Sequence, residues 1–145
     1  MSAISPEETR GRILLVEDDP EAALFAVHVL TKRAQFDVTH TADPAVALGL
    51  AAAGPWDLVL TDLELPGMTG LDLLHALREA APGLPVAVVT ANVPTGTTHE
   101  ALLSEADAYL SKPLRIDQLI STATDLIRNG RPTRSTSGDG GLRSR

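Results

Sequence analysis

The chain has 145 residues, 43 % of them hydrophobic, which is the composition of a globular protein with enough residues for one domain and its core. It has no cysteine, which excludes disulfides, thiolate metal sites and thiol nucleophiles, and no apolar run that approaches the roughly 18 residues of a membrane span. The net charge of the whole chain is −7, and residues 1–127 carry 7 basic and 18 acidic side chains. Such an acidic composition makes a poor surface for nucleic acid, because phosphates attract clustered lysine and arginine.

Short apolar runs alternate with longer helical patterns along the chain. In chain order we expect strand 12–17, helix 20–34, strand 36–41, helix 43–53, strand 56–61, helix 70–80, strand 85–90, helix 97–105, strand 108–111 and helix 116–128. Several strands lack polar alternation, which is typical of strands covered on both faces. The alternation predicts an α/β fold of the flavodoxin-like, doubly wound (βα)5 type, with a five-stranded parallel sheet in the order 2-1-3-4-5.

The two ends of the chain differ from this domain, which we place at residues 11–128. Residues 1–10 are expected to be flexible, and they lack the apolar stretch of a signal peptide, which favours a cytoplasmic location without membrane contact. Residues 129–145 are rich in Arg, Gly, Ser and Thr and are too few for a second folded module. This composition favours a disordered basic tail, with a binding arm as the alternative.

Polar residues stand where the predicted strands end, which is where open α/β sheets bind ligands. These residues are Glu17, Asp18 and Asp19 after the first strand, Asp62 after the third, Thr90 at the end of the fourth and Lys112 after the fifth. A single aspartate there is often only a helix N-cap, as Asp19 before Pro20 could be. Several carboxylates at one rim would repel one another unless a cation joined them, and oxygen ligands favour Mg²⁺ or Mn²⁺.

The remaining polar residues suit a phosphoryl group bound beside that metal ion. The Lys112 ammonium could neutralise one phosphoryl oxygen, and the Thr90 hydroxyl could donate to another. Asp62 would then be the nucleophile, as in enzymes that form an aspartyl phosphate. The histidines, His28, His40, His75 and His99, fall on different elements, and we assign them no metal or phosphohistidine role.

Four segments resemble the receiver domain of bacterial two-component response regulators: ILLVEDDP, DLVLTDLELPGMTGLDLL, PVAVVTA and ADAYLSKPL. The resemblance covers about residues 11–128 and implies that a sensor histidine kinase or phosphotransfer protein phosphorylates Asp62. It also implies an Mg²⁺ site formed by Glu17, Asp18, Asp62 and the backbone carbonyl of Glu64. Thr90 and Tyr109 would form the switch, and the Lys112–Pro113 peptide bond would be cis. From the residues alone, Tyr109 also fits a half-buried strand aromatic with a hydrated hydroxyl.

Our leading hypothesis is a stand-alone regulator, similar to a chemotaxis regulator, that binds an unknown downstream protein when phosphorylated. It would catalyse only its own phosphorylation and dephosphorylation and would not bind DNA; whether it forms a homodimer stays open. One alternative is a phosphatase with an aspartyl-phosphate intermediate, which would need a second acid and a cap over the substrate. Another is a pseudo-receiver scaffold that never carries phosphate. Glu64 adds a carboxylate two residues after Asp62, and we hypothesise that it affects access of the hydrolytic water.

Overall fold

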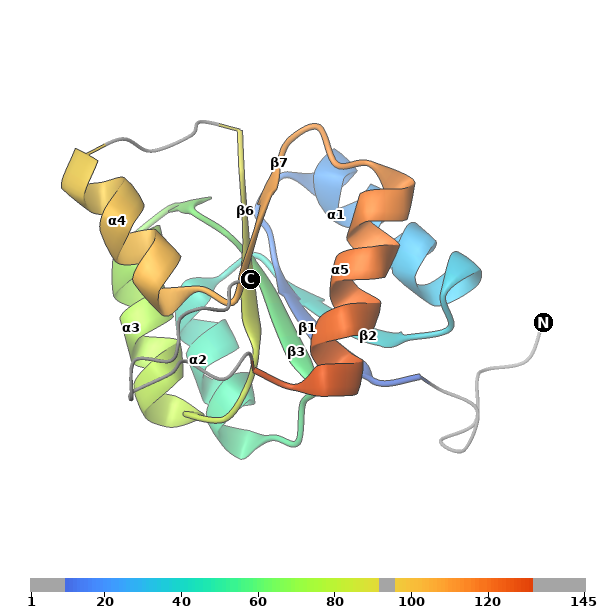
Figure 1. Cartoon of the computed structure of the whole chain (residues 1–145), viewed down its shortest axis with the longest axis horizontal. Helices are drawn as coiled ribbons and strands as arrows, with labels where there is room; N and C mark the ends of the chain where they lie inside the picture. The colour runs from blue at the N-terminus through green and yellow to red at the C-terminus, as the bar shows by residue number, and fades with distance from the viewer. Residues whose placement is uncertain (1–9, 92–95, 132–145) are drawn as a thin grey trace, which may run out of the picture.

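The computed structural model describes residues 10–91 and 96–131, which form one parallel sheet flanked by helices (Figure 1). The strands of the sheet are β1 (Arg12–Val16), β2 (Asp37–Thr41), β3 (Leu58–Asp62), β6 (Val86–Thr90) and β7 (Ala108–Ser111). All pairings are parallel, in the order β2-β1-β3-β6-β7. This is the order 2-1-3-4-5 that the sequence predicts, so the flavodoxin-like fold is confirmed.

Helices follow the strands as the sequence predicts. They are α1 (Pro20–His28), α2 (Pro44–Ala53), α3 (Gly70–Ala80), α4 (Gly96–Glu105) and α5 (Ile116–Asn129). The predicted helix 20–34 is α1 followed by one turn of π-helix, η1 (Val29–Arg33). Two aspartates cap helix N-termini: Asp19 Oδ1 accepts from the N–H of Glu21, and Asp43 Oδ1 accepts from the N–H of Ala45. None of the helices in the described ranges has the length and apolarity needed to cross a membrane.

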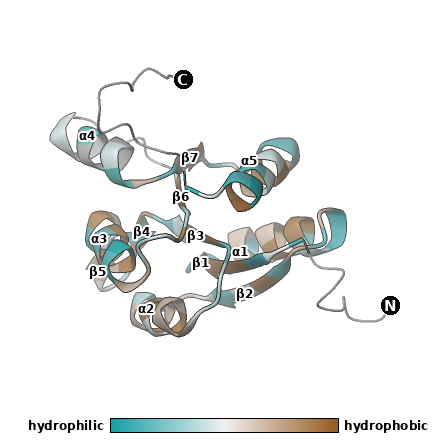
Figure 2. Ribbon diagram, turned by 60° about the horizontal axis from the view of Figure 1, so that its bottom comes forward, coloured by the Kyte–Doolittle hydropathy of each residue, from teal (hydrophilic) through white to brown (hydrophobic). Residues whose placement is uncertain are grey.

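The sheet buries both faces, which explains the absence of polar alternation in its central strands. Figure 1 shows α1 and α5 covering one face and α2, α3 and α4 covering the other. Alternate residues of one strand therefore enter different cores: Leu58 and Leu60 pack with α1 and α5, and Val59 packs with α2 and α3. The helices carry both polar and apolar residues, as the teal and brown segments of α3 and α5 show in Figure 2.

The third strand is shorter than predicted, and a small hairpin follows it. β3 begins at Leu58 rather than at residue 56. Trp56 lies before the strand, and its indole Nε1–H donates to the Leu50 carbonyl at 2.7 Å. Beyond β3, the chain forms the antiparallel pair β4 (Glu64–Leu65) and β5 (Met68–Thr69). They are joined by a turn at Pro66 and Gly67, and strands of two residues carry no recognisable pattern in the sequence.

At the amino ends of the strands, a buried carboxylate joins three parts of the chain. Asp107, whose side chain is 0 % exposed, accepts from Arg78 Nη2 at 2.6 Å, from the backbone N–H of Val86 at 2.9 Å and from Arg131 Nε at 3.2 Å. Arg78 also donates to the carbonyl of Glu105, the last residue of α4. This network ties α3, α4 and the segment after α5 together at the end of the sheet opposite Asp62.

The predicted boundaries of the domain, at residues 11 and 128, and of the two terminal segments stay predictions. Most of the expected flexible segment, residues 1–10, and most of the expected tail, residues 129–145, lie outside the described residues. Within the described part, α5 continues to Asn129, one residue past the predicted end of the domain, and the chain then turns at Gly130 with a φ of 73°.

Candidate functional site

Three carboxylates meet at the carboxyl ends of β1 and β3. Glu17, Asp18 and Asp62 each offer an oxygen, and these oxygens lie within 4.8 Å of one another. Glu17 and Asp62 are both 3 % exposed, whereas Asp18 is exposed. Parallel pairing of β1 with β3 brings the two strand ends together, since Val16 is the register partner of Thr61. The sheet topology thus concentrates the acidic residues that the sequence places far apart.

Lys112 lies between two of these carboxylates. Its Nζ is 2.9 Å from Asp62 Oδ2, 3.1 Å from Glu17 Oε1 and 3.2 Å from Glu17 Oε2. Burial by itself would lower the pKa of Lys112, but the hydrogen bonds and charges of Asp62 and Glu17 raise it above its ordinary value. The ammonium therefore stays charged and offsets part of the negative charge of the cluster.

The buried position of Glu17 raises the pKa of its carboxyl. Desolvation is the main cause, and the hydrogen bond and charge of Asp62 add to it, while hydrogen bonds from the Asp19 N–H and Lys112 act in the opposite direction. Asp19 N lies 3.1 Å from Glu17 Oε2. A divalent cation would compete with the proton for Glu17, because metal ligands bind in the deprotonated form.

The donor set fits a hard divalent cation. The three side chains supply carboxylate oxygens only, on a rim where Asp18 faces solvent, and Mg²⁺ takes one or two carboxylates together with waters and phosphate oxygens. Glu64 lies beside the cluster, at the exposed start of β4, and its N–H donates to Asp62 Oδ1 at 2.9 Å. That its carbonyl is a further metal ligand stays a prediction.

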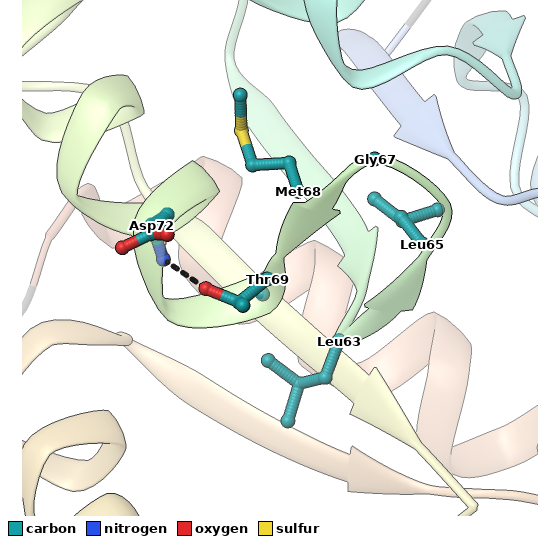
Figure 3. Close-up of a pocket in the computed structure, with 7 residues that line it drawn as sticks. Leu63, Leu65, Gly67, Met68, Thr69 and Asp72 are labelled. Carbon is teal, nitrogen blue, oxygen red and sulfur yellow. Dashed lines mark hydrogen bonds between the residues drawn. The ribbon is translucent and has the colours of Figure 1, made fainter.

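The segment after Asp62 is held by the hairpin and by α3 (Figure 3). Thr69 caps α3 by accepting from the N–H of Asp72 at 3.1 Å, and a pocket of about 530 Å³ lies between the hairpin and this first helical turn. A Cβ atom on Gly70 would lie 2.7 Å from the backbone of Leu63, so only glycine allows this close approach. Asp62 therefore stands between a buried strand and a closely packed turn.

The two predicted switch residues lie on the neighbouring strands β6 and β7, and Tyr109 packs on the sheet face that α2, α3 and α4 cover. Thr90 ends β6 and is 1 % exposed, and its carbonyl accepts from the N–H of Lys112 at 2.9 Å. Tyr109 in β7 is the register partner of Val88, and it packs against the core on this face. Its hydroxyl is buried rather than hydrated, and burial raises its pKa. The peptide bond Lys112–Pro113 is cis, as predicted.

One contact to the acidic cluster was not expected from the sequence. His40 Nε2 lies 2.8 Å from the carbonyl oxygen of Glu17. The sequence gives little indication of this contact, because His40 is 23 residues from Glu17. Only the pairing of β1 with β2 brings the two residues together. Sequence reasoning on strand ends alone could not find it.

Comparison with known proteins agrees with this geometry. The family model for the response regulator receiver domain matches residues 13–124. The DNA-binding response regulator MtrA of Mycolicibacterium smegmatis is 38 % identical over 119 residues, which make up 82 % of this chain and 51 % of MtrA. The probable transcriptional regulatory protein TcrX of Mycobacterium tuberculosis is 32 % identical over 126 residues, 87 % of this chain and 53 % of TcrX. The chain spans about half the length of these relatives.

Solved structures give the same result. The receiver domain of the Francisella response regulator 1452 superposes with a TM-score of 0.72 at 30 % identity and covers 82 % of this chain and 98 % of its own. The receiver domain of the sensor histidine kinase PA1611 of Pseudomonas aeruginosa has a TM-score of 0.73 at 28 % identity, covers 81 % and 98 % of the two chains, and was solved with a magnesium ion coordinated in its active site cleft. With its fold, its acidic rim and its matched residues, the chain belongs to the family of response regulator receiver domains.

Proposed function

We propose that this receiver domain accepts a phosphoryl group on Asp62 from a sensor histidine kinase or phosphotransfer protein. One observation carries the proposal: the Lys112 ammonium is bonded to Asp62 and Glu17 in a cluster of three carboxylates that fits Mg²⁺. A buried nucleophile with cations on two sides is what phosphoryl transfer needs, because this reaction depends mainly on positioning and on charge neutralisation.

Each residue of the site has a role in this reaction. An oxygen of Asp62 attacks the phosphorus as the bond to the donor breaks. Glu17 and Asp18 would hold the metal ion, which when bound would neutralise phosphoryl oxygens. Lys112, which contacts the Asp62 carboxylate, would bind the incoming group instead. Its contact with the Glu17 carboxylate would keep the ammonium charged. The domain turns over no outside substrate, and we expect it to act in the cytoplasm.

The phosphoryl group would act on Tyr109 through Thr90, which ends the strand next to β3. It adds a charge of about −1.5 to −2 and new acceptor oxygens at Asp62. A hydrogen bond from the Thr90 hydroxyl to one of these oxygens would draw the end of β6 inward, and Tyr109, on the neighbouring strand β7, would repack in response. The surface read by a partner is then the one around α4, β7 and α5, because a ligand shifts populations only through contacts that differ between the two states.

We further propose that the output is binding to a downstream protein. The acidic composition of residues 1–127 supports this, since it disfavours contact with nucleic acid. The second candidate is a receiver domain that controls DNA binding, and it is favoured by the relative MtrA, which is named a DNA-binding response regulator. Chromatography of the phosphorylated and unphosphorylated protein with candidate partners and with DNA would separate the two.

The proposal is tested by incubating the protein with Mg²⁺ and acetyl phosphate and measuring its intact mass. We expect one added phosphoryl group, located on Asp62 by peptide mapping, and no adduct when a chelator removes the metal. An unmodified protein at high donor concentration would support the pseudo-receiver scaffold instead. Steady hydrolysis of an added phosphoester, well beyond one turnover, would support the phosphatase.

The Glu64→Asn variant should lose its phosphoryl group more slowly than the wild type. Glu64 is exposed beside Asp62, so its carboxylate can accept a hydrogen bond from the attacking water, which an asparagine side chain orients less well. The effect should be smaller than the ~10²-fold that a fixed general base contributes, because the side chain is not buried. Autodephosphorylation of the two proteins is followed by mass after removal of the donor, and equal rates would contradict the role of Glu64.

A further inference from the structure

Two residues of strand β2 form hydrogen bonds with the backbone of Glu17, one with its N–H and one with its carbonyl. The N–H of Glu17 donates to the carbonyl of Thr41 at 3.1 Å, and the carbonyl of Glu17 lies 2.8 Å from Nε2 of His40. A carbonyl oxygen can only accept, so Nε2 must carry the hydrogen and donate it. The plane of the peptide bond that joins Glu17 to Asp18 is thus set by a side chain of the neighbouring strand.

This peptide bond lies where the sheet no longer fixes the chain. β1 ends at Val16, so Glu17 and Asp18 extend beyond its last register pair, Val16 with Thr41. The carboxylate of Glu17 is buried and is held by Lys112 and by the N–H of Asp19. Asp18 differs because its side chain is exposed, so packing does not fix its direction. The orientation of Asp18 depends on the peptide that precedes it.

We propose that His40 is a positioning residue for the metal site: its Nε2–H fixes the Glu17–Asp18 peptide so that the Asp18 carboxylate points into the cluster. The inference rests on the proposed function, since His40 would support the site at which Glu17, Asp18 and Asp62 would bind the ion. Such outer partners commonly change metal affinity about 10- to 100-fold when they are removed. His40 itself touches neither the metal nor the phosphoryl group.

A purely structural role makes a different prediction. His40 is exposed at the edge of the sheet, so its loss removes little buried surface and should leave the midpoint of urea unfolding nearly unchanged. If the hydrogen bond served only to pin β2 to β1, stability would fall and metal affinity would not. Measuring both quantities on the same variants separates the two roles.

The test compares His40→Leu with His40→Gln, which keeps an amide N–H at a similar reach, and with His28→Leu, the same change at an exposed site in the last turn of α1. Mn²⁺ affinity is measured by the loss of the free-ion signal in electron paramagnetic resonance. We expect His40→Leu to bind about 10-fold more weakly, His40→Gln to remain closer to the wild type, and His28→Leu to bind as the wild type does.

The outcomes separate this inference from the proposed function. If the wild type binds Mn²⁺ and His40→Leu binds equally well, the role of His40 is wrong and the metal site stands. If the wild type binds no divalent ion, the proposed metal site falls and the role of His40 falls with it. A second measurement, long-range ¹H–¹⁵N correlation of the histidine ring, should show hydrogen on Nε2 of His40; a ring protonated on Nδ1 alone would overturn the inference.

Discussion

The Asp62→Asn variant is expected to gain no phosphoryl group from acetyl phosphate and Mg²⁺. An amide is not a nucleophile toward phosphorus, so the variant lacks the carboxylate whose Oδ1 accepts from the N–H of Glu64 and whose Oδ2 accepts from Lys112. Intact mass after incubation measures the result. Divalent-ion affinity should fall as well, because one of the three clustered oxygen donors becomes a weaker ligand.

The matched control is Asp19→Asn, the same substitution in the loop between β1 and α1. Asparagine caps helices about as well as aspartate, so α1 should start normally and phosphorylation should persist. Folding of Asp62→Asn should be preserved, because Lys112 keeps its contacts with Glu17, and a buried carboxylate is removed from a crowded cluster. A phosphorylated Asp62→Asn protein would show that another residue accepts the group and would overturn the proposed site.

The sequence predicts the sheet well because its signals are physical and local. A buried parallel strand needs an apolar run, and β3 and β6 are buried at every position. Helix starts are marked by Asp19 and Asp43, whose side chains accept hydrogen bonds from the first turns. The predicted strand order also predicts the position of the site, since it puts the carboxyl ends of β1, β3 and β7 at the same edge of the sheet.

Features that depend on register or on small differences in packing were not predicted. His40 reaches Glu17 only because β2 pairs with β1 in one particular register. The π-helical turn η1 breaks no pattern in the sequence, since the buried Val29 and Leu30 also fit a continuous α-helix. The hydroxyl of Tyr109 is buried by the core that surrounds β7, which no property of the strand sequence reveals.

The ion pair at the far end of the sheet differs from the rim in what it does. Asp107 has partners on α3, β6 and the segment after α5, and Arg131 reaches both its carboxylate and the carbonyl of Pro82. The carboxylate is fully buried, and Arg78 is nearly so, with 12 % of its side chain exposed. Here two guanidiniums face one carboxylate, whereas at the rim the three acids outnumber Lys112 and leave a place for a cation.

The Asp107→Ala variant should therefore lose about 3–5 kcal/mol of unfolding free energy, because it leaves the Arg78 guanidinium buried without its carboxylate and removes the acceptor of the Val86 N–H. Urea unfolding measures the change. The matched control is Asp37→Ala, since Asp37 pairs with Arg12 at 3.7 Å but is 58 % exposed, and exposed pairs contribute less than about 1 kcal/mol. A similar small loss in both variants would mean that Asp107 adds no more to stability than a surface charge.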